Sequence, residues 1–168
     1  MHLQPYQSVD GTPFTATRED IIRAHGPPHS EERNNIGLTA LDYGALVYRF
    51  QDSGRLEEVT TRAQVLHLGA LAIPFGTLAA FVRTNDRAAF ERAGFLVSPR
   101  YGIAFVPGES CWVTALARHC LPQWEAMGAR GVPIRLMFVE CNGGIRLRQS
   151  GILGWYVGIG GRGSLRNR

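Results

Sequence analysis

The chain has 168 residues, a length that fits one ordinary domain or two very small ones, and its 45% hydrophobic content excludes a chain that is disordered as a whole. No run of 18 apolar residues occurs, so we expect no membrane-spanning helix. All 18 basic residues are arginines, and the positive excess lies in one part: residues 1–127 hold 11 arginines against 13 acidic residues, whereas residues 128–168 hold seven against one.

A short helix is predicted near the start of the chain. Thr17 suits the N-cap position, Glu19 and Asp20 fall in the first turn, where the helix dipole favours acids, and Gly26 suits the left-handed C-cap. The helix has room for roughly two to three turns, so packing must stabilise it. The polar residues 29–36 that follow predict a loop.

Two β-hairpins are predicted further along. Asp52-Ser53-Gly54 forms the first turn, because glycine adopts a positive φ without a Cβ clash. A second turn at Gly108 joins a similar pair of apolar segments, and each hairpin begins Tyr-Gly and ends Val-Thr. The four expected strands cover residues 41–50, 55–60, 101–106 and 111–114.

Helices and single strands are predicted around the second hairpin. Residues 61–70 favour a strand, and residues 75–85 favour a helix. The next expected elements are a short helix over 87–93, a strand over 95–97 and a helix over 115–127.

Two short motifs repeat at nearly equal offsets, which indicates an internal duplication. Pro-Phe occurs at 13 and 74, 61 residues apart, and Tyr-Gly occurs at 43 and 101, 58 residues apart. We therefore predict an α+β fold for residues 1–127, with two helix–β-hairpin units over about 12–70 and 73–127. The units would share one antiparallel sheet with the helices on one face. Residues 128–168 form an Arg/Gly-rich C-terminal extension.

The cysteines and histidines favour neither a disulfide framework nor a structural zinc site. Cys111, Cys120 and Cys141 are an odd number without paired spacing. The adjacent residues His119 and Cys120 cannot form a nucleophile–base pair with each other in the ordinary geometry. His25 and His29 are four apart, but a Gly-Pro-Pro sequence between them breaks any helix. We expect no metal, no cofactor and no catalytic residues.

The paired acids Glu57 and Glu58 follow the turn of the first hairpin. Adjacent residues of a strand point to opposite faces of a sheet. We therefore expect a solvated pair rather than two carboxylates that act together.

A pattern over residues 12–60 carries a resemblance. A helix ends at Gly26-Pro27-Pro28, and the following strand pair carries Tyr43, Phe50, Gly54, Leu56 and Val59. This order resembles the helix–hairpin module of the beta-lactamase-inhibitor-protein and BamE type, and residues 73–114 match it more loosely. The resemblance implies a protein-binding module rather than an enzyme. A tandem form is similar to immunity proteins that neutralise bacterial toxins.

The expected function is therefore occlusion of a bacterial toxin or enzyme by a cytoplasmic protein, since the N-terminal residues show no secretory signal. Aromatic and arginine side chains supply most of the binding energy in such interfaces. The residues expected to contact the cognate protein are Tyr43, Tyr48, Arg49, Arg100, Tyr101 and Trp112, of which Tyr48 and Trp112 also suit the core.

Two other classes stay open. One is a small hydrolase or transferase that uses Cys111 or Cys120 with His119. The other is a nucleic-acid-associated protein that binds through the arginines of residues 128–168. No interleaved aromatic platform beyond Trp155 and Tyr156 accompanies these arginines to support a specific nucleic-acid module, so the sequence favours a protein partner over nucleic acid.

Overall fold

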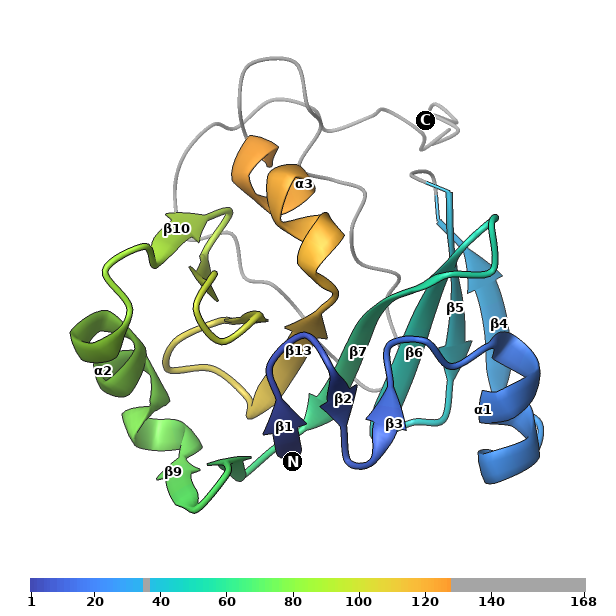
Figure 1. Ribbon diagram of the computed structural model, residues 1–168, viewed down its shortest axis with the longest axis horizontal. Helices are drawn as coiled ribbons and strands as arrows, with labels where there is room; N and C mark the ends of the chain where they lie inside the picture. The colour runs from blue at the N-terminus through green and yellow to red at the C-terminus, as the bar shows by residue number, and fades with distance from the viewer. Residues whose placement is uncertain (35–36, 128–168) are drawn as a thin grey trace, which may run out of the picture.

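The computed structural model describes residues 1–34 and 37–127 (Figure 1). Within these residues the chain forms an α+β fold with three short α-helices and two β-sheets, which agrees with the predicted class. No helix among them is both long and apolar enough to cross a membrane. The predictions for residues 128–168 lie outside the described residues.

The larger sheet has eight strands in the order β10-β11-β12-β13-β7-β6-β5-β4. Two four-stranded antiparallel meanders meet in its middle, where β7 pairs with β13. The first meander comprises β4 (Ser30–Arg33), β5 (Leu38–Asp42), β6 (Leu46–Gln51) and β7 (Leu56–Arg62). The second comprises β10 (Phe90–Arg92), β11 (Phe95–Ser98), β12 (Ile103–Phe105) and β13 (Trp112–Leu116).

The smaller sheet has five strands in the order β3-β2-β1-β8-β9. They are β1 (His2–Gln4), β2 (Ser8–Val9), β3 (Thr12–Pro13), β8 (Val65–Leu68) and β9 (Leu71–Pro74). The prediction of a single shared sheet is therefore not confirmed, because the two meanders share the larger antiparallel sheet but the chain also forms this second one. The chain leaves the larger sheet after β7, and the N-terminal residues supply new partners, with β1 parallel to β8.

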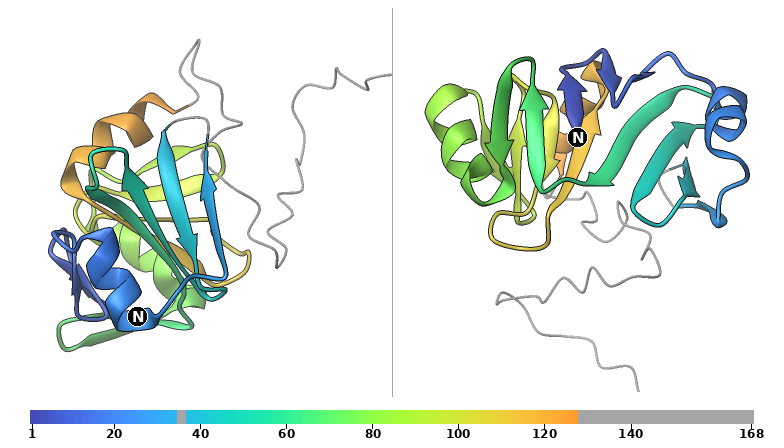
Figure 2. Two further views of the ribbon diagram at one scale, coloured as in Figure 1. Left: turned by 90° about the vertical axis from the view of Figure 1, so that its right-hand side faces the viewer. Right: turned by 90° about the horizontal axis from the view of Figure 1, so that it is seen from below.

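The helices do not all lie on one face of the larger sheet. Helix α1 (Arg18–His25) and helix α2 (Phe75–Asn85) bury apolar side chains in the main core, whereas α3 (Leu121–Ala126) covers the opposite face. Strand β11 shows the two faces directly, since Leu96 belongs to the main core while Phe95 and Val97 pack with Trp124 of α3. Helices α1 and α2 lie at opposite ends of the molecule (Figures 1 and 2).

The expected helix starts are confirmed for α1 and α2. Thr17 and Asp20 form a reciprocal capping box at the start of α1, and Gly26 ends that helix with a φ of 80°. The helix expected over 115–127 begins later than predicted. Strand β13 continues to Leu116, and a 3₁₀ turn, η1 (Arg118–Cys120), precedes α3.

Three local predictions in the larger sheet are wrong. The loop expected over residues 29–36 contains strand β4, and the helix expected over 87–93 contains strand β10. The single strand expected over 41–50 is interrupted before β6, because Gly44 takes a φ of 85° in a turn.

The ring of Tyr6 packs against the backbone of Gly102, and this contact generates a prediction. An added Cβ at Gly102 would lie 2.8 Å from Tyr6 Cε1, and the φ of Gly102 is +61°. We expect Gly102→Ala to reduce the free energy of unfolding by roughly 2–4 kcal/mol, through backbone strain together with overpacking.

Gly94→Ala is the matched control, because its φ is +86° but nothing lies within 4 Å of its added Cβ. Gly94→Ala should reduce the free energy of unfolding by only about 1–2 kcal/mol, through backbone strain alone. Urea denaturation measures both values, and equal losses in the two variants would contradict close packing of Tyr6 on Gly102.

Candidate functional site

A β-bulge in the first hairpin brings two acidic side chains to one face. Arg49 pairs with Glu58 and Phe50 pairs with Leu56, so Glu57 is an extra residue on β7. Because the bulge interrupts the alternation, both glutamates face η1 and α3. Glu57 is 1% exposed and Glu58 is 4% exposed. The prediction of a solvated pair is therefore wrong.

Glu57 is the centre of a polar cluster, which we call the Glu57 cluster: Glu57, His119 and Cys120. The Nε2 atom of His119 lies 2.5 Å from Glu57 Oε2, and the Cys120 thiol donates to the same oxygen at 2.9 Å. Arg55 Nε donates to the other carboxylate oxygen at 2.8 Å. The three side chains of the cluster offer atoms that metal ions bind, all within 4.8 Å of one another.

Glu58 occupies the adjoining buried position. Its Oε1 accepts a hydrogen bond from Trp124 Nε1 at 3.1 Å, and its Oε2 lies 3.7 Å from Arg49 Nη1. Burial raises the pKa of the Glu58 carboxyl, and the Arg49 guanidinium opposes that increase only in part. Arg49 also donates to Thr60 Oγ1 at 2.7 Å, while its buried Nε has no hydrogen-bond partner among the described residues.

The geometry does not give either cysteine a histidine base. Cys120 contacts a carboxylate instead of the imidazole, and burial raises the pKa of its thiol, as does the nearby Glu57. Cys111 precedes strand β13 while His119 follows it, and the five residues of that strand span roughly 16 Å. The structure therefore does not bring Cys111 and His119 together, and a thiolate nucleophile at Cys120 is disfavoured.

A second cluster lies on the surface, and we call it the arginine–aromatic surface: Tyr6, Phe81, Arg100, Tyr101 and Arg118. The Arg100 guanidinium lies 5.5 Å from the Tyr101 ring centroid, and that ring lies 5.4 Å from the Phe81 ring. Tyr6 donates its hydroxyl hydrogen to the Pro99 carbonyl oxygen. The Arg118 guanidinium lies 4.1 Å from the Tyr6 ring centroid. Two exposed arginines thus stack on two half-buried tyrosines.

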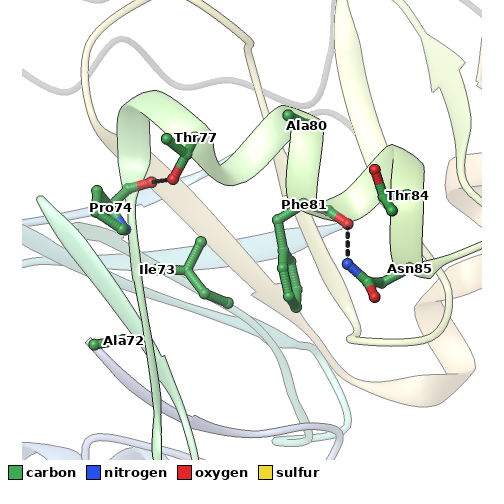
Figure 3. Close-up of a pocket in the computed structure, with 8 residues that line it drawn as sticks. All are labelled: Ala72, Ile73, Pro74, Thr77, Ala80, Phe81, Thr84 and Asn85. Carbon is green, nitrogen blue, oxygen red and sulfur yellow. Dashed lines mark hydrogen bonds between the residues drawn. The ribbon is translucent and has the colours of Figure 1, made fainter.

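An open groove adjoins this surface between β9 and α2, with a volume of about 390 Å³. Figure 3 shows the side chains of Ile73 and Phe81 pointing into the space between the strand and the helix. Phe81 belongs both to the groove and to the arginine–aromatic surface. The groove is mainly apolar and is lined by Ala72, Ile73, Pro74, Thr77, Ala80, Phe81, Thr84 and Asn85.

The six residues expected to bind a partner do not form one patch. Tyr48 and Arg49 are 2% and 4% exposed, so a partner cannot reach them in this structure and we withdraw both from the binding surface. Tyr48 joins the core, where its hydroxyl lies 3.0 Å from His25 Nε2. Arg49 is held by Glu58 and Thr60.

The other four expected residues keep some exposure. Arg100 and Tyr101 lie together in the arginine–aromatic surface. Tyr43 is half-buried beside α1 and donates to the Gly26 carbonyl oxygen at 3.0 Å. Trp112 is half-buried at the start of β13, with the Arg62 guanidinium 5.7 Å from its ring centroid. The structure brings only Arg100 and Tyr101 into one surface.

Sequence reasoning missed three members of this surface, Tyr6, Phe81 and Arg118. They lie in the N-terminal segment, in α2 and in η1, so no sequence spacing connects them. Nothing in the sequence placed Tyr6 against Gly102, which lies 96 residues later.

The buried Cys120 gives a prediction about thiol chemistry. In the native chain, iodoacetamide should modify Cys120 at least about tenfold more slowly than the half-buried Cys111, because the thiolate form is suppressed and access is blocked. Peptide mapping by mass spectrometry separates the two sites. Both should react at similar rates in urea, and fast native modification of Cys120 would restore the cysteine-enzyme alternative.

The raised pKa of Glu58 gives a prediction about pH. The folded state favours the protonated Glu58 carboxyl. The carboxyl therefore stabilises the fold below its pKa in the unfolded chain, about 4.3, and this stabilisation is lost as pH rises through the higher pKa of the folded state. The unfolding free energy of Glu58→Gln, relative to the original chain, should therefore increase as pH rises from about 4.

Urea denaturation at a series of pH values measures this difference. Glu109→Gln removes a carboxyl at an exposed position and serves as the control. If the difference between Glu58→Gln and the original chain did not change with pH, the assigned direction of the Glu58 shift would be wrong.

Comparisons with known protein families, with curated proteins and with solved structures found no match for this chain. The similarity of residues 12–60 to the inhibitor-type helix–hairpin module therefore stays a prediction. The chemistry of the Glu57 cluster and of the arginine–aromatic surface is the ground on which a function can be assigned.

Proposed function

We propose that this chain is a protein-binding module of the immunity or inhibitor type, which occludes a cognate toxin or enzyme. The observation that carries the proposal is the arginine–aromatic surface, in which Arg100 and Arg118 stack on Tyr101 and Tyr6 beside an apolar groove. The helix–hairpin resemblance of residues 12–60 points to the same class of function.

The composition of this surface suits a protein interface. Tyrosine and arginine are enriched where interfaces bind most strongly, because they offer large contact areas that combine apolar and polar groups. The stacked rings and guanidinium groups are already ordered by their neighbours, which lowers the entropy cost of binding. The apolar groove beside Phe81 is suited to the centre of such an interface, with Arg100 at its rim, where its guanidinium donates to the Asn85 carbonyl oxygen.

The charges of the surface favour an acidic partner. Arg100 and Arg118 are exposed, whereas the neighbouring Asp86 is 5% exposed. The Asp86 carboxylate accepts hydrogen bonds from Ser98 Oγ at 2.6 Å and from the Arg100 backbone N–H at 2.9 Å. Asp86 is therefore hydrogen-bonded within the chain, and the charges that this surface presents to solvent are the positive charges of Arg100 and Arg118. Such a surface speeds association with an acidic partner and selects against basic ones.

The order of elements supports the duplication that the module resemblance implies. Helix α1 precedes β4 to β7, and helix α2 precedes β10 to β13, so each half has one helix followed by four antiparallel strands. We include the duplication in the proposal: two units of one ancestral kind would together carry the interface.

The test begins with affinity isolation of a partner from the organism's own lysate, using the full chain after nuclease treatment. The binding affinity of the isolated partner is then measured for the original chain and for a variant with Arg100→Glu and Arg118→Glu. Reversal of two charges at the rim should weaken binding by at least about tenfold. The matched control is Arg23→Glu, an exposed arginine on α1 at the far end of the molecule.

Three results would contradict the proposal. One is the recovery of no stoichiometric protein partner. The second is binding that the reversal of Arg100 and Arg118 leaves unchanged. The third is an equal loss of affinity in Arg23→Glu, which would indicate a general charge effect and not this surface.

A further inference from the structure

The Glu57 cluster has no part in the proposed protein-binding surface, and its three side chains meet at one point. Glu57 Oε2 lies 2.5 Å from His119 Nε2 and 2.9 Å from Cys120 Sγ. A buried carboxylate is costly unless it is paired and hydrogen-bonded, and Arg55 supplies one such partner to Glu57. Here one carboxylate also gathers an imidazole and a thiol, which are two further types of metal ligand.

The donor set selects among metals. A thiolate, an imidazole and a carboxylate together suit a borderline-soft ion of tetrahedral preference, and Zn²⁺ is the commonest such ion in proteins. Three protein ligands with a fourth position left for water are typical of zinc sites that are not purely structural. Hard ions such as Mg²⁺ and Ca²⁺ prefer all-oxygen sites and fit this set poorly.

The two distances from Glu57 Oε2 to the other ligand atoms are close to what zinc requires, and all three ligand atoms lie within 4.8 Å of one another. With zinc bonds of about 2.0 Å to nitrogen and oxygen and about 2.3 Å to sulfur, tetrahedral ligand atoms lie roughly 3.3–3.6 Å apart. The distances from Glu57 Oε2 to His119 Nε2 and Cys120 Sγ would each lengthen by less than about 1 Å. Small side-chain rotations can supply that change without moving a strand.

The surroundings of the cluster suit a metal site as well. Arg55 Nε holds the second oxygen of Glu57 at 2.8 Å, which orients the carboxylate as outer hydrogen bonds orient metal ligands elsewhere. Glu57 is anchored in the sheet, and Cys120 is buried on η1. The side chain of His119 is 35% exposed, so an ion and a water molecule can approach the cluster from its side.

We propose that Glu57, His119 and Cys120 bind one transition-metal ion, with Zn²⁺ as the preferred ion. Metal binding forms one bond each to oxygen, nitrogen and sulfur and releases the thiol proton of Cys120 to solvent. The proton that now joins His119 Nε2 to Glu57 Oε2 also leaves this position, to solvent or to Nδ1 of the neutral imidazole, so that Nε2 presents its lone pair to the ion. The bonds replace the hydrogen bonds that now join the three side chains. The site shares no residue with the arginine–aromatic surface, so either proposal can fail without the other.

The test uses untagged full-length chain with Cys111→Ser and Cys141→Ser, which leaves Cys120 as its single thiol. Titration with Co²⁺ should give one ion per chain, with a thiolate-to-cobalt charge-transfer absorption and the visible bands of a tetrahedral site. Added Zn²⁺ should displace the cobalt and raise the melting temperature. His119→Asn and Cys120→Ser should each weaken binding by at least about tenfold, and Cys120→Ser should abolish the charge-transfer band.

His29→Asn is the matched control, because it removes an exposed histidine from a different part of the chain and should leave the affinity unchanged. Circular dichroism of each metal-free variant shows whether it is folded. If Cys120→Ser fails to fold, the partly exposed His119→Asn carries the test.

A folded chain that binds no Co²⁺ with a charge-transfer band would overturn the proposal. So would binding that His119→Asn leaves intact, or an equal loss in His29→Asn. In each of those cases the three side chains form a hydrogen-bonded cluster only.

Discussion

The pairing of β7 with β13 is the contact on which the other features depend. Five residue pairs, from Trp112 with Arg62 to Leu116 with Glu58, join two segments that lie about fifty residues apart in sequence. The pairing merges two four-stranded meanders into one sheet and closes the main core across them. It also carries η1 to the bulge of β7, where His119 and Cys120 meet Glu57.

Both clusters therefore depend on long-range contacts. The Glu57 cluster forms where the bulge and η1 meet. The arginine–aromatic surface forms where η1 meets the N-terminal segment and where the turn between β11 and β12 meets α2. Buried carboxylates such as Glu58 are costly unless they are hydrogen-bonded or paired. Glu58 accepts a hydrogen bond from Trp124 and forms an ion pair with Arg49. A purely structural core would be simpler to build from apolar residues, so the polar cluster suggests a role beyond stability.

Much of the secondary structure could be predicted from local signals, and the failures have a common cause. The caps of α1, the helix α2 and the strands β11 to β13 follow from turn residues and apolar patterns. Strands β4 and β10 lie at the two edges of the larger sheet, where exposed residues lack the apolar alternation that marks an inner strand. The smaller sheet was also missed, because pairing between residues 2–4 and 65–68 leaves no local signal.

The candidate sites were harder to predict than the fold. Strict alternation placed Glu57 in solvent, and the register shift that buries it depends on the partner strand β6. His119 and Cys120 were considered together in the sequence, but the carboxylate that joins them lies 62 and 63 residues earlier. Arg100 and Tyr101 lie together on one surface, and their role in binding stays a prediction, whereas the burial of Tyr48 and Arg49 depends on tertiary packing.

The most direct test of the proposed protein binding is amide hydrogen exchange of the full chain, free and bound to its isolated partner. We expect slower exchange on binding at residues 99–102 and in the second half of α2, whereas protection confined to the far end, at α1 and β4, would contradict binding through the arginine–aromatic surface.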